Sequence, residues 1–295
     1  VISRSGENNY ENIHRHADCG LIVNTTPVGM YPNNGKSPLS LKGFHSLRGV
    51  IDIIFNPLKT ALVLEAEDAG VPAAGGLHML VSQAVGSAQA FTGKKYDPSQ
   101  AKKSCEYFTG QALGDEKIHE VDKALLRELE NIVLVGMPGC GKTVIGRRLA
   151  AALKRPFIDL DGEIEKTAGK TIPQIFAEDG EEEFRRIETE CCIEAGKKCG
   201  CVISTGGGVV TREQNRAPLR QNGTVVFLIR PLESLATANR PLLQAHSVQE
   251  LANQRLPLYN AWADVKMLNT GINSTVENLI RFLHLKKAEG GHREA

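Results

Sequence analysis

Alternating apolar and polar stretches in the first third of the chain predict the strands and helices of an α/β domain. Apolar runs that end in turn residues predict buried strands at GLIVNTTPVG and GVIDIIFNP. Helical periodicity closed by a glycine predicts helices at TALVLEAEDAG and HMLVSQAVGSAQAFTG. The opening residues, VISR, have the pattern of a strand end. Because the chain starts there with valine, we expect it to be a fragment that begins within a domain.

From residue 131 onward, apolar runs and helical segments alternate regularly. Five runs predict strands: IVLVG, PFIDL, CVIST, TVVFLI and DVKML. This alternation is typical of a parallel sheet with helices on both faces. Residues 94–130 are polar and charged, which predicts a linker with one solvated helix. We therefore expect a domain at 1–93, a linker at 94–130, a second domain at 131–288 and a disordered tail at 289–295.

Composition is that of a globular protein. The 295 residues suffice for two domains, and 41% hydrophobic and 23% charged residues allow real cores. The formal net charge of +1 gives no electrostatic basis for binding nucleic acid or an anionic membrane. No apolar run reaches the roughly 18 residues of a membrane-spanning helix, and no signal peptide opens the chain. Seven cysteines without a CxxC pair favour reduced thiols, so we expect a cytoplasmic protein.

The most specific motif is the octet GMPGCGKT at residues 136–143, which fits GxxxxGK[ST] between a predicted strand and a predicted helix. Glycines let backbone N–H groups turn toward phosphate oxygens, and the helix that follows directs its positive end at the same anion. Lys142 supplies a charge for the β- and γ-phosphates, and Thr143 supplies a hydroxyl for Mg²⁺. The octet therefore predicts a site for ATP or GTP. Cys140 lies within it, either as a small residue in place of serine or alanine or as a thiol whose oxidation blocks ATP.

Carboxylates at the end of the second predicted strand of this domain suggest how the phosphate acceptor is held. FIDLD places Asp159 and Asp161 at the edge of the sheet where ligands bind in open α/β folds. Strand alternation predicts that both side chains lie on one side, where one can hold Mg²⁺ through water and the other can orient a hydroxyl. A helix N-cap is an alternative interpretation of Asp161.

Two further groups of residues, later in the same predicted domain, are candidates for binding the phosphate acceptor. GEEEFRRIETECC predicts a helix in which Arg185 and Arg186 come four residues after Glu181 and Glu182. Exposed ion pairs are the simpler interpretation of these arginines, and we prefer it for Arg186. CVISTGGGVV leads a buried strand into three glycines, which permit close backbone approach to a small ligand; a tight turn is the alternative.

Together these motifs resemble the shikimate kinase family. GMPGCGKT, DLD, EEFRRIE, TGGG, NRPLL and QRLPLY occur in that order over roughly residues 131–286. The resemblance implies an α/β fold, a P-loop parallel sheet like that of the nucleoside-monophosphate kinases with helices on both faces. It also implies ATP-dependent phosphorylation of shikimate at its 3-hydroxyl, in the chorismate pathway of aromatic amino acid biosynthesis. The implied partners are shikimate and ATP, with Mg²⁺ as cofactor and without nucleic acid or membrane.

The resemblance also implies a role for each matching residue. The residues implied to bind ATP are Gly136, Gly139, Cys140, Gly141, Lys142, Thr143, Val144 and Arg240. Thr143, and Asp159 through water, would hold the metal. Asp161 would hold and polarise the 3-hydroxyl, so the implied catalytic residues are Asp161, Lys142 and Arg240. The residues implied to bind shikimate are Asp161, Arg185, Gly206, Gly207, Gly208 and Arg255, the two arginines through its carboxylate.

The chain departs from the family pattern near the lid. The segment PLESLATANRPLL looks shorter than usual, and Ala236 and Thr237 stand where a basic residue near the adenine is often found. The stretch between Arg240 and Arg255 also looks short. We expect weaker adenine contacts and altered lid closure, but not loss of the reaction.

Residues 1–93 resemble the C-terminal half of shikimate dehydrogenase, through VNTTPVGMYP, IDIIFNPLKTALV and GGLHMLVSQAVGSAQAFTG. The resemblance implies a partial Rossmann-type domain, in which Ser3 and Arg4 hold the NADP 2′-phosphate and Gln83 holds shikimate. The implied nicotinamide region is Thr25, Thr26, Gly29, Ile53 and Gly76. Phe55 stands where the family usually has tyrosine, which implies the loss of one hydroxyl contact to the substrate. The family's N-terminal substrate domain and glycine-rich turn have no counterpart here. We therefore expect no dehydrogenase activity, NADP binding only in a complete domain, and the missing half as a candidate partner; Gln83 and the threonine pair are alternatively ordinary residues of a remnant.

Two other functions stay open at this point. One keeps the phosphate loop but takes another small polyol, gluconate-like or nucleotide-like, as acceptor. The other is a non-catalytic module that binds ATP and braces a dehydrogenase. Asp161, Arg185 and Arg255 together favour an acceptor that carries a carboxylate and hydroxyls.

Overall fold

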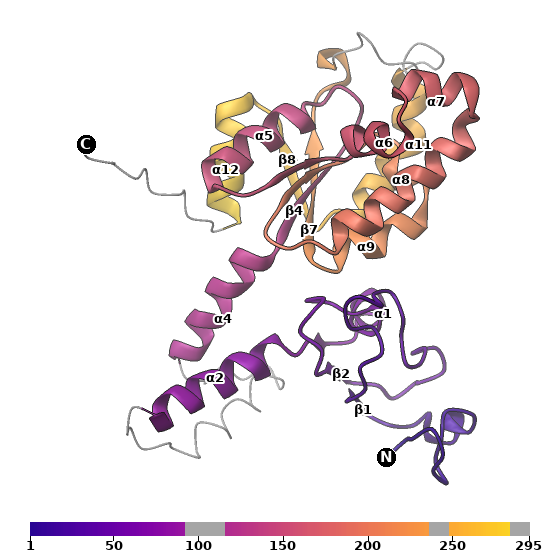
Figure 1. Ribbon diagram of the computed structural model, residues 1–295, viewed down its shortest axis with the longest axis vertical. Helices are drawn as coiled ribbons and strands as arrows, with labels where there is room; N and C mark the ends of the chain where they lie inside the picture. Colours follow the sequence, from indigo (N-terminus) through magenta and orange to yellow (C-terminus); the bar gives the residue numbers. More distant parts are fainter. Residues whose placement is uncertain (92–115, 236–247, 284–295) are drawn as a thin grey trace. The chain divides into compact units, whose positions relative to one another are not determined.

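The computed structural model describes residues 1–91, 116–235 and 248–283. The chain divides into two compact units, Val1–Leu126 and Arg127–Ala295 (Figure 1). Predictions for Arg240, Ala236 and Thr237, for residues 94–115 of the linker and for the tail lie outside the described residues. Within the described part of the chain, no helix has both the length and the apolar character needed to cross a membrane.

The first unit contains a parallel three-stranded sheet in the order β1-β2-β3. Its elements are η1 (Ile13–His16), β1 (Leu21–Asn24), β2 (Gly49–Asp52), α1 (Ala61–Asp68), β3 (Ala73–Ala74) and α2 (Leu77–Phe91). Asn24 lies opposite Asp52 across the two strand ends, and its Nδ2 donates to Asp52 Oδ1 at 3.1 Å. Thr60, the N-cap of α1, donates to Asp52 Oδ2 at 2.7 Å, so this buried carboxylate ties both strands to the helix.

The strand expected at VISR is not formed. Ser3 makes an isolated bridge to Asn9, and its hydroxyl accepts a hydrogen bond from the Gly6 N–H at 2.8 Å. Asn9 and Asn12 likewise bond to nearby backbone groups. Short polar side chains that satisfy local backbone groups favour turns over strands, which explains why the apolar start of the chain misled the prediction.

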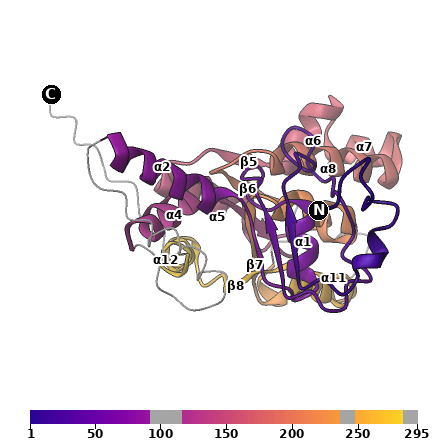
Figure 2. The same ribbon diagram turned by 90° about the horizontal axis from the view of Figure 1, so that it is seen from below.

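The second unit is a parallel five-stranded sheet in the order β5-β6-β4-β7-β8. All five predicted strands are confirmed: β4 (Asn131–Val135), β5 (Phe157–Asp159), β6 (Val202–Ser204), β7 (Gly223–Ile229) and β8 (Val265–Leu268). Figures 1 and 2 show α5 (Lys142–Leu153) and α12 (Ile272–Phe282) on one face and α8 (Gly180–Gly196), α9 (Arg216–Arg220) and α11 (Val248–Trp262) on the other. β4 is buried at every position, as expected for a central parallel strand.

Shorter helices complete this unit: α6 (Leu160–Ala168), α7 (Ile172–Glu178), η3 (Val209–Thr211), η4 (Glu213–Asn215) and η5 (Leu232–Ser234). The helix predicted in the linker is α4 (Glu116–Leu129). Its last turn belongs to the second unit, because the Leu129 carbonyl accepts from Gly200 N–H at 2.7 Å and Arg155 Nη1 donates to the Glu130 carbonyl at 2.9 Å.

Register brings three chain segments to one edge of the sheet. Ser204, the last residue of β6, pairs with Leu134 of β4 on one side and with Asp159 of β5 on the other. The phosphate-loop octet, the Asp159–Asp161 pair and the three glycines all follow these strand ends. They therefore meet at the carboxyl edge, where open α/β sheets bind ligands.

Candidate functional site

The octet forms a tight loop between β4 and α5. Gly136 has φ +149°, and a Cβ there would lie 2.6 Å from the Leu228 carbonyl oxygen, so glycine is required by both backbone and space. Gly139 (φ +82°) and Gly141 (φ +99°) also have left-handed backbones. Lys142 opens α5 and is buried, and its Nζ donates to the carbonyls of Gly136 at 2.8 Å and Met137 at 3.1 Å. The loop thus holds an ammonium group among backbone dipoles at a helix N-terminus, a suitable place for a polyphosphate.

Side-chain oxygens lie near the start of α5. Thr143 Oγ1 lies 3.4 Å from Ser204 Oγ. Burial, and then the charge of Asp161, raise the pKa of Asp159 above its ordinary value, while Arg147 and Lys142 act in the opposite direction. Hydroxyl and carboxylate oxygens are the ligands Mg²⁺ prefers, and it commonly completes its shell with water and substrate phosphates. Within the described residues, no group of three or more His, Cys, Asp or Glu side chains is placed to hold a metal ion.

Asp161 lies in the first turn of α6 and is not its N-cap, so that alternative is wrong. The N-cap is Asp159, whose side chain makes no cap hydrogen bond. β5 also ends at Asp159, so strand alternation is not what brings the two carboxylates together. The sharp change from strand to helix does so, and the charge of Asp161 adds to the effect of burial in raising the pKa of Asp159.

The three glycines bring the parts of the site together. A Cβ added at Gly206 would lie 2.9 Å from Asp161 Oδ1, and one at Gly208 would lie 2.3 Å from Arg185 Nη1. A Cβ at Gly207 would lie 2.6 Å from Pro138 Cγ of the phosphate loop. Each glycine therefore admits a different neighbour, which a plain turn does not require. The close approach of a small ligand stays a prediction; the groups that the structure places against these glycines are the side chains of Asp161, Pro138 and Arg185.

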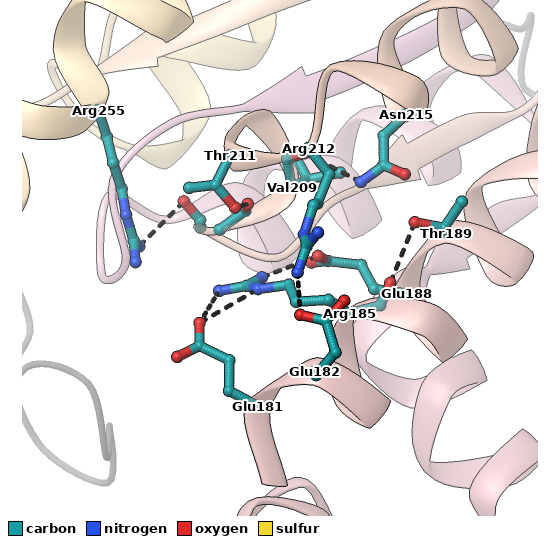
Figure 3. Close-up of polar contacts among 12 residues, drawn as sticks. Glu181, Glu182, Arg185, Glu188, Thr189, Val209, Thr211, Arg212, Asn215 and Arg255 are labelled. Carbon is teal, nitrogen blue, oxygen red and sulfur yellow. Dashed lines mark hydrogen bonds and ion pairs between the residues drawn. The ribbon is translucent and has the colours of Figure 1, made fainter.

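Arg185 lies buried on α8 and is ion-paired with the carboxylates of two glutamates (Figure 3). Its Nη1 donates to Glu188 Oε2 at 2.8 Å, and its Nη2 to Glu181 Oε1 at 3.1 Å. Burial raises the pKa of Glu188, although the charge of Arg185 opposes this. The pair with Glu181 was an alternative interpretation, as an exposed pair, but Arg185 is buried. Glu188, three residues later, was missed, although the i, i+3 spacing in EEFRRIE was a usable signal.

Arg186 is exposed and ion-paired as predicted, but with different partners. It pairs with Glu183 at 2.7 Å and with Glu190, whereas Glu182 pairs with Arg212 (Figure 3). The expected pair with Glu182 is therefore wrong. Arg212 comes from the 3-10 segment after the glycines, a neighbour that helical spacing alone could not indicate.

Arg255 reaches the glycines from α11. Its Nη1 donates to the Gly207 carbonyl at 3.2 Å, and the Tyr259 hydroxyl donates to the same oxygen. Behind the turn, Asn215 Nδ2 donates to the Val209 carbonyl at 3.0 Å and Thr211 Oγ1 to the Gly208 carbonyl at 2.7 Å (Figure 3).

Arg255 Nε and Glu188 Oε1 are buried near the glycine turn and have no hydrogen-bond partner within the described residues; the same holds for Asn215 Oδ1 behind the turn. The first is a donor of a cation and the second an oxygen of a carboxyl group. Buried polar groups are nearly always satisfied, so unpaired ones beside a glycine turn indicate a site for a polar ligand.

The remaining predicted ATP-site residues differ in exposure. Cys140 is fully buried, with its Sγ 4.0 Å from Lys142 Nζ, whereas Val144 is 53% exposed. Reactive cysteines are usually partly exposed, so the structure favours a packing role for Cys140.

Some of the predicted dehydrogenase residues lie near one another at the ends of β1 and β2: the Ile53 N–H donates to the carbonyl of Asn24, the residue before Thr25, at 3.2 Å. Thr25 and Thr26 line a cavity of about 510 Å³ together with Tyr10 and Phe44, and Asn24 Oδ1 accepts hydrogen bonds from Thr26. Gly76 packs against Ile53 so closely that a Cβ would lie 1.9 Å from the Ile53 carbonyl oxygen, and Gly29 has φ +95°. Phe55 and Gln83 are exposed, and neither they, Arg4 nor Gly76 lines that cavity.

Comparisons with known proteins agree with the geometry of the second unit. The family model for shikimate kinase matches residues 138–284. A shikimate kinase of Pelotomaculum thermopropionicum is 42% identical over 165 residues, which cover 52% of this chain and 96% of that protein. The solved shikimate kinase of Acinetobacter baumannii in complex with shikimate is 38% identical, with a TM-score of 0.51, over 55% of this chain and 97% of that one.

A further match is to shikimate dehydrogenase 1 of Peptoclostridium difficile, 36% identical over 34% of this chain and 39% of that one. Its TM-score is 0.30, which does not assign a family to residues 1–93, so that part of the prediction stays a prediction.

Proposed function

This chain belongs to the shikimate kinase family, and on that premise we propose that it transfers the γ-phosphoryl group of ATP to the 3-hydroxyl of shikimate. One observation carries the proposal: three consecutive glycines are contacted by Asp161, by the phosphate loop and by Arg185. The nucleotide and acceptor sides of the reaction therefore share one short backbone segment.

On the nucleotide side, the loop N–H groups and Lys142 would hold the β- and γ-phosphates. Lys142 Nζ is hydrogen-bonded to two loop carbonyls, so it can exchange carbonyl partners for phosphate oxygens without leaving the loop. When bound, Mg²⁺ supplies charge neutralisation at the phosphates, and Thr143 and Asp159 are the residues that would hold it.

On the acceptor side, Arg185 and Arg255 would bind the carboxylate of shikimate and Asp161 its 3-hydroxyl. Both guanidinium groups are buried, and Arg255 Nε lacks a partner in the described residues, so an incoming carboxylate would satisfy it. Glu188 would keep Arg185 in place through the 2.8 Å ion pair. Asp161 would then orient the hydroxyl and accept its proton, so that positioning and charge complementarity carry the catalysis.

A carboxylate-bearing acceptor fits these residues better than a neutral polyol does. Arg185 is already paired with Glu181 and Glu188, whereas Arg255 donates to the Gly207 carbonyl and its Nε has no partner within the described residues. A carboxylate matches the planar fork of a guanidinium group in geometry, which a neutral hydroxyl does not. Arg240, in the implied lid, would reach the transferring phosphate; it lies outside the described residues.

For residues 1–93 we propose an origin in the C-terminal half of a shikimate dehydrogenase, as part of a bifunctional dehydrogenase–kinase chain. The parallel β1-β2-β3 sheet is compatible with a partial Rossmann-type domain. No dehydrogenase activity is expected from these residues alone, and NADP binding is expected only with the complete domain. A cytoplasmic location belongs to the same proposal.

An assay of ADP release tests the kinase proposal. ADP should form with ATP, Mg²⁺ and shikimate, and the product should carry phosphorus on the 3-oxygen by ³¹P and ¹H NMR. Shikimate methyl ester and gluconate, which lack the carboxylate or the ring, should give little turnover. ADP release that is equal with gluconate, or absent with shikimate, would contradict the proposal.

A further inference from the structure

Asn269 links the last strand of the sheet to the phosphate loop. It follows β8, and its backbone N–H donates to the Ile229 carbonyl at 2.8 Å. Its side-chain Nδ2 donates to the Cys140 carbonyl at 2.7 Å. A residue outside the GxxxxGK[ST] motif therefore makes a direct contact with the backbone of the motif.

The orientation of the Asn269 amide is fixed from its other end. Oδ1 accepts hydrogen bonds from the Gly271 N–H at 3.1 Å and from Thr275 Oγ1 at 3.3 Å. A backbone N–H can only donate, and a carbonyl can only accept. The oxygen must therefore face Gly271 and the nitrogen must face Cys140, so the network specifies asparagine rather than aspartate.

This contact orients one peptide group of the loop. The peptide bond between Cys140 and Gly141 is planar and trans, so its C=O and N–H point in opposite directions. Holding the Cys140 carbonyl toward β8 directs the Gly141 N–H away from β8. Gly141 has φ +99°, and a Cβ there would lie 3.0 Å from Asn269 Nδ2, so the glycine and the asparagine fit closely.

We propose that Asn269 is a positioning residue for nucleotide binding, which presets the Gly141 N–H for a phosphate oxygen. The inference deepens the proposed function, since it rests on the loop's binding of nucleotide phosphates. It does not depend on which acceptor is used. Presetting a donor lowers the cost of ordering the loop when the phosphates bind.

Asn269→Asp is the most informative variant. It keeps the shape of the side chain and the oxygen that accepts from the Gly271 N–H, but it replaces the Nδ2 donor with a second oxygen facing the Cys140 carbonyl. We expect the Kd for ADP, titrated directly, to rise about 10-fold or more, since two facing acceptors repel and the loop must reorient. The Kd for shikimate should change less than twofold. The control is Asn273→Asp, the same chemical change on an exposed residue of α12, which should leave both constants within twofold.

Asn269→Ala provides a second variant that adds no charge. It should weaken ADP binding by several-fold with shikimate binding unchanged. ADP binding within twofold of wild type in both variants would overturn the proposal, as would a parallel loss of ADP and shikimate binding with a fall in Tm, which indicates a merely structural role. Failure of the kinase proposal would appear separately, as absent shikimate-dependent turnover in the wild type with ADP binding intact.

Discussion

Gly208 and Arg185 are in such close contact that a single added carbon at position 208 would lie 2.3 Å from the Nη1 of the arginine. The clash falls on the end of a long side chain, but that end is buried and held by Glu188. The guanidinium group therefore cannot move aside without breaking a buried ion pair, so the buried position of Arg185 requires the absence of a side chain at position 208.

Gly208→Ala should displace Arg185 and raise the KM for shikimate by about 10-fold or more, with the Kd for ADP unchanged. The matched control is Gly162→Ala in α6, where the nearest atom to an added Cβ is 3.9 Å away. That change should leave kinetics unaltered and increase stability by up to about 1 kcal/mol, as alanine favours helix. An unchanged shikimate KM in Gly208→Ala would contradict the assigned role of Arg185.

Arg185→Lys should raise the KM for shikimate by about 10-fold or more, because an ammonium group cannot reproduce a planar bidentate donor. Steady-state kinetics with varied shikimate measures this. Arg186→Lys, at the adjacent and exposed position, should remain within twofold of wild type. Equal effects of the two substitutions would show that the site does not distinguish the buried arginine from the exposed one.

Asp161→Asn should reduce kcat by at least about 100-fold, because an amide cannot accept the proton of the attacking hydroxyl. The Kd for ADP should be unchanged, since the phosphate loop does not need this carboxylate. Single-turnover kinetics and an ADP titration measure the two effects separately. Retention of kcat would remove Asp161 from the proposed chemistry.

Asp159→Asn should stabilise the protein increasingly as the pH rises. Burial and the charge of Asp161 raise the folded-state pKa of Asp159 above its ordinary 3.8. The stability contribution of such a group is fully present below the ordinary pKa and is lost as the pH rises through the folded-state pKa. Thermal melts of wild type and variant between pH 4 and pH 8 should show a Tm difference that widens upward from about pH 4; a constant or narrowing gap would contradict this sign.

Cys140→Ser should lose activity in peroxide at the same rate as wild type, because the Cys140 thiol is fully buried. Within the described residues Cys199 is an exposed thiol, and mass spectrometry should find it oxidised before Cys140. Faster inactivation of the wild type, prevented by bound ATP, would instead support the hypothesis that oxidation of Cys140 blocks the nucleotide.

The strands, their parallel pairing and the phosphate loop could be predicted because they rest on local signals. Apolar runs mark buried strands, and glycines at fixed spacing mark a backbone that only glycine adopts. Asp159 and the three glycines lie at or just after the carboxyl ends of two parallel strands, so their places in the sequence predicted that they share one edge of the sheet.

What could not be predicted depends on contacts between distant segments. Glu182 pairs with Arg212 and not with Arg186. The Tyr259 hydroxyl and Arg255 both donate to the Gly207 carbonyl. The side chain of Asn269 donates to the Cys140 carbonyl. Each of these follows from how helices and loops pack over the sheet, which no spacing along the chain encodes. The strand expected at VISR failed for a related reason, since apolar character there was outweighed by polar side chains a few residues later.

The pairing of Ser204 with both Leu134 and Asp159 means that the reaction centre cannot exist before the sheet is correctly aligned. A slip of β6 by one residue would turn its side chains to the opposite face and draw the glycines away from Asp161 and Arg185. Ligands that contact all three segments therefore bind only the protein in which β6 has its native register. Saturating shikimate and nucleotide should then slow global unfolding and protect the β6 amides from hydrogen exchange.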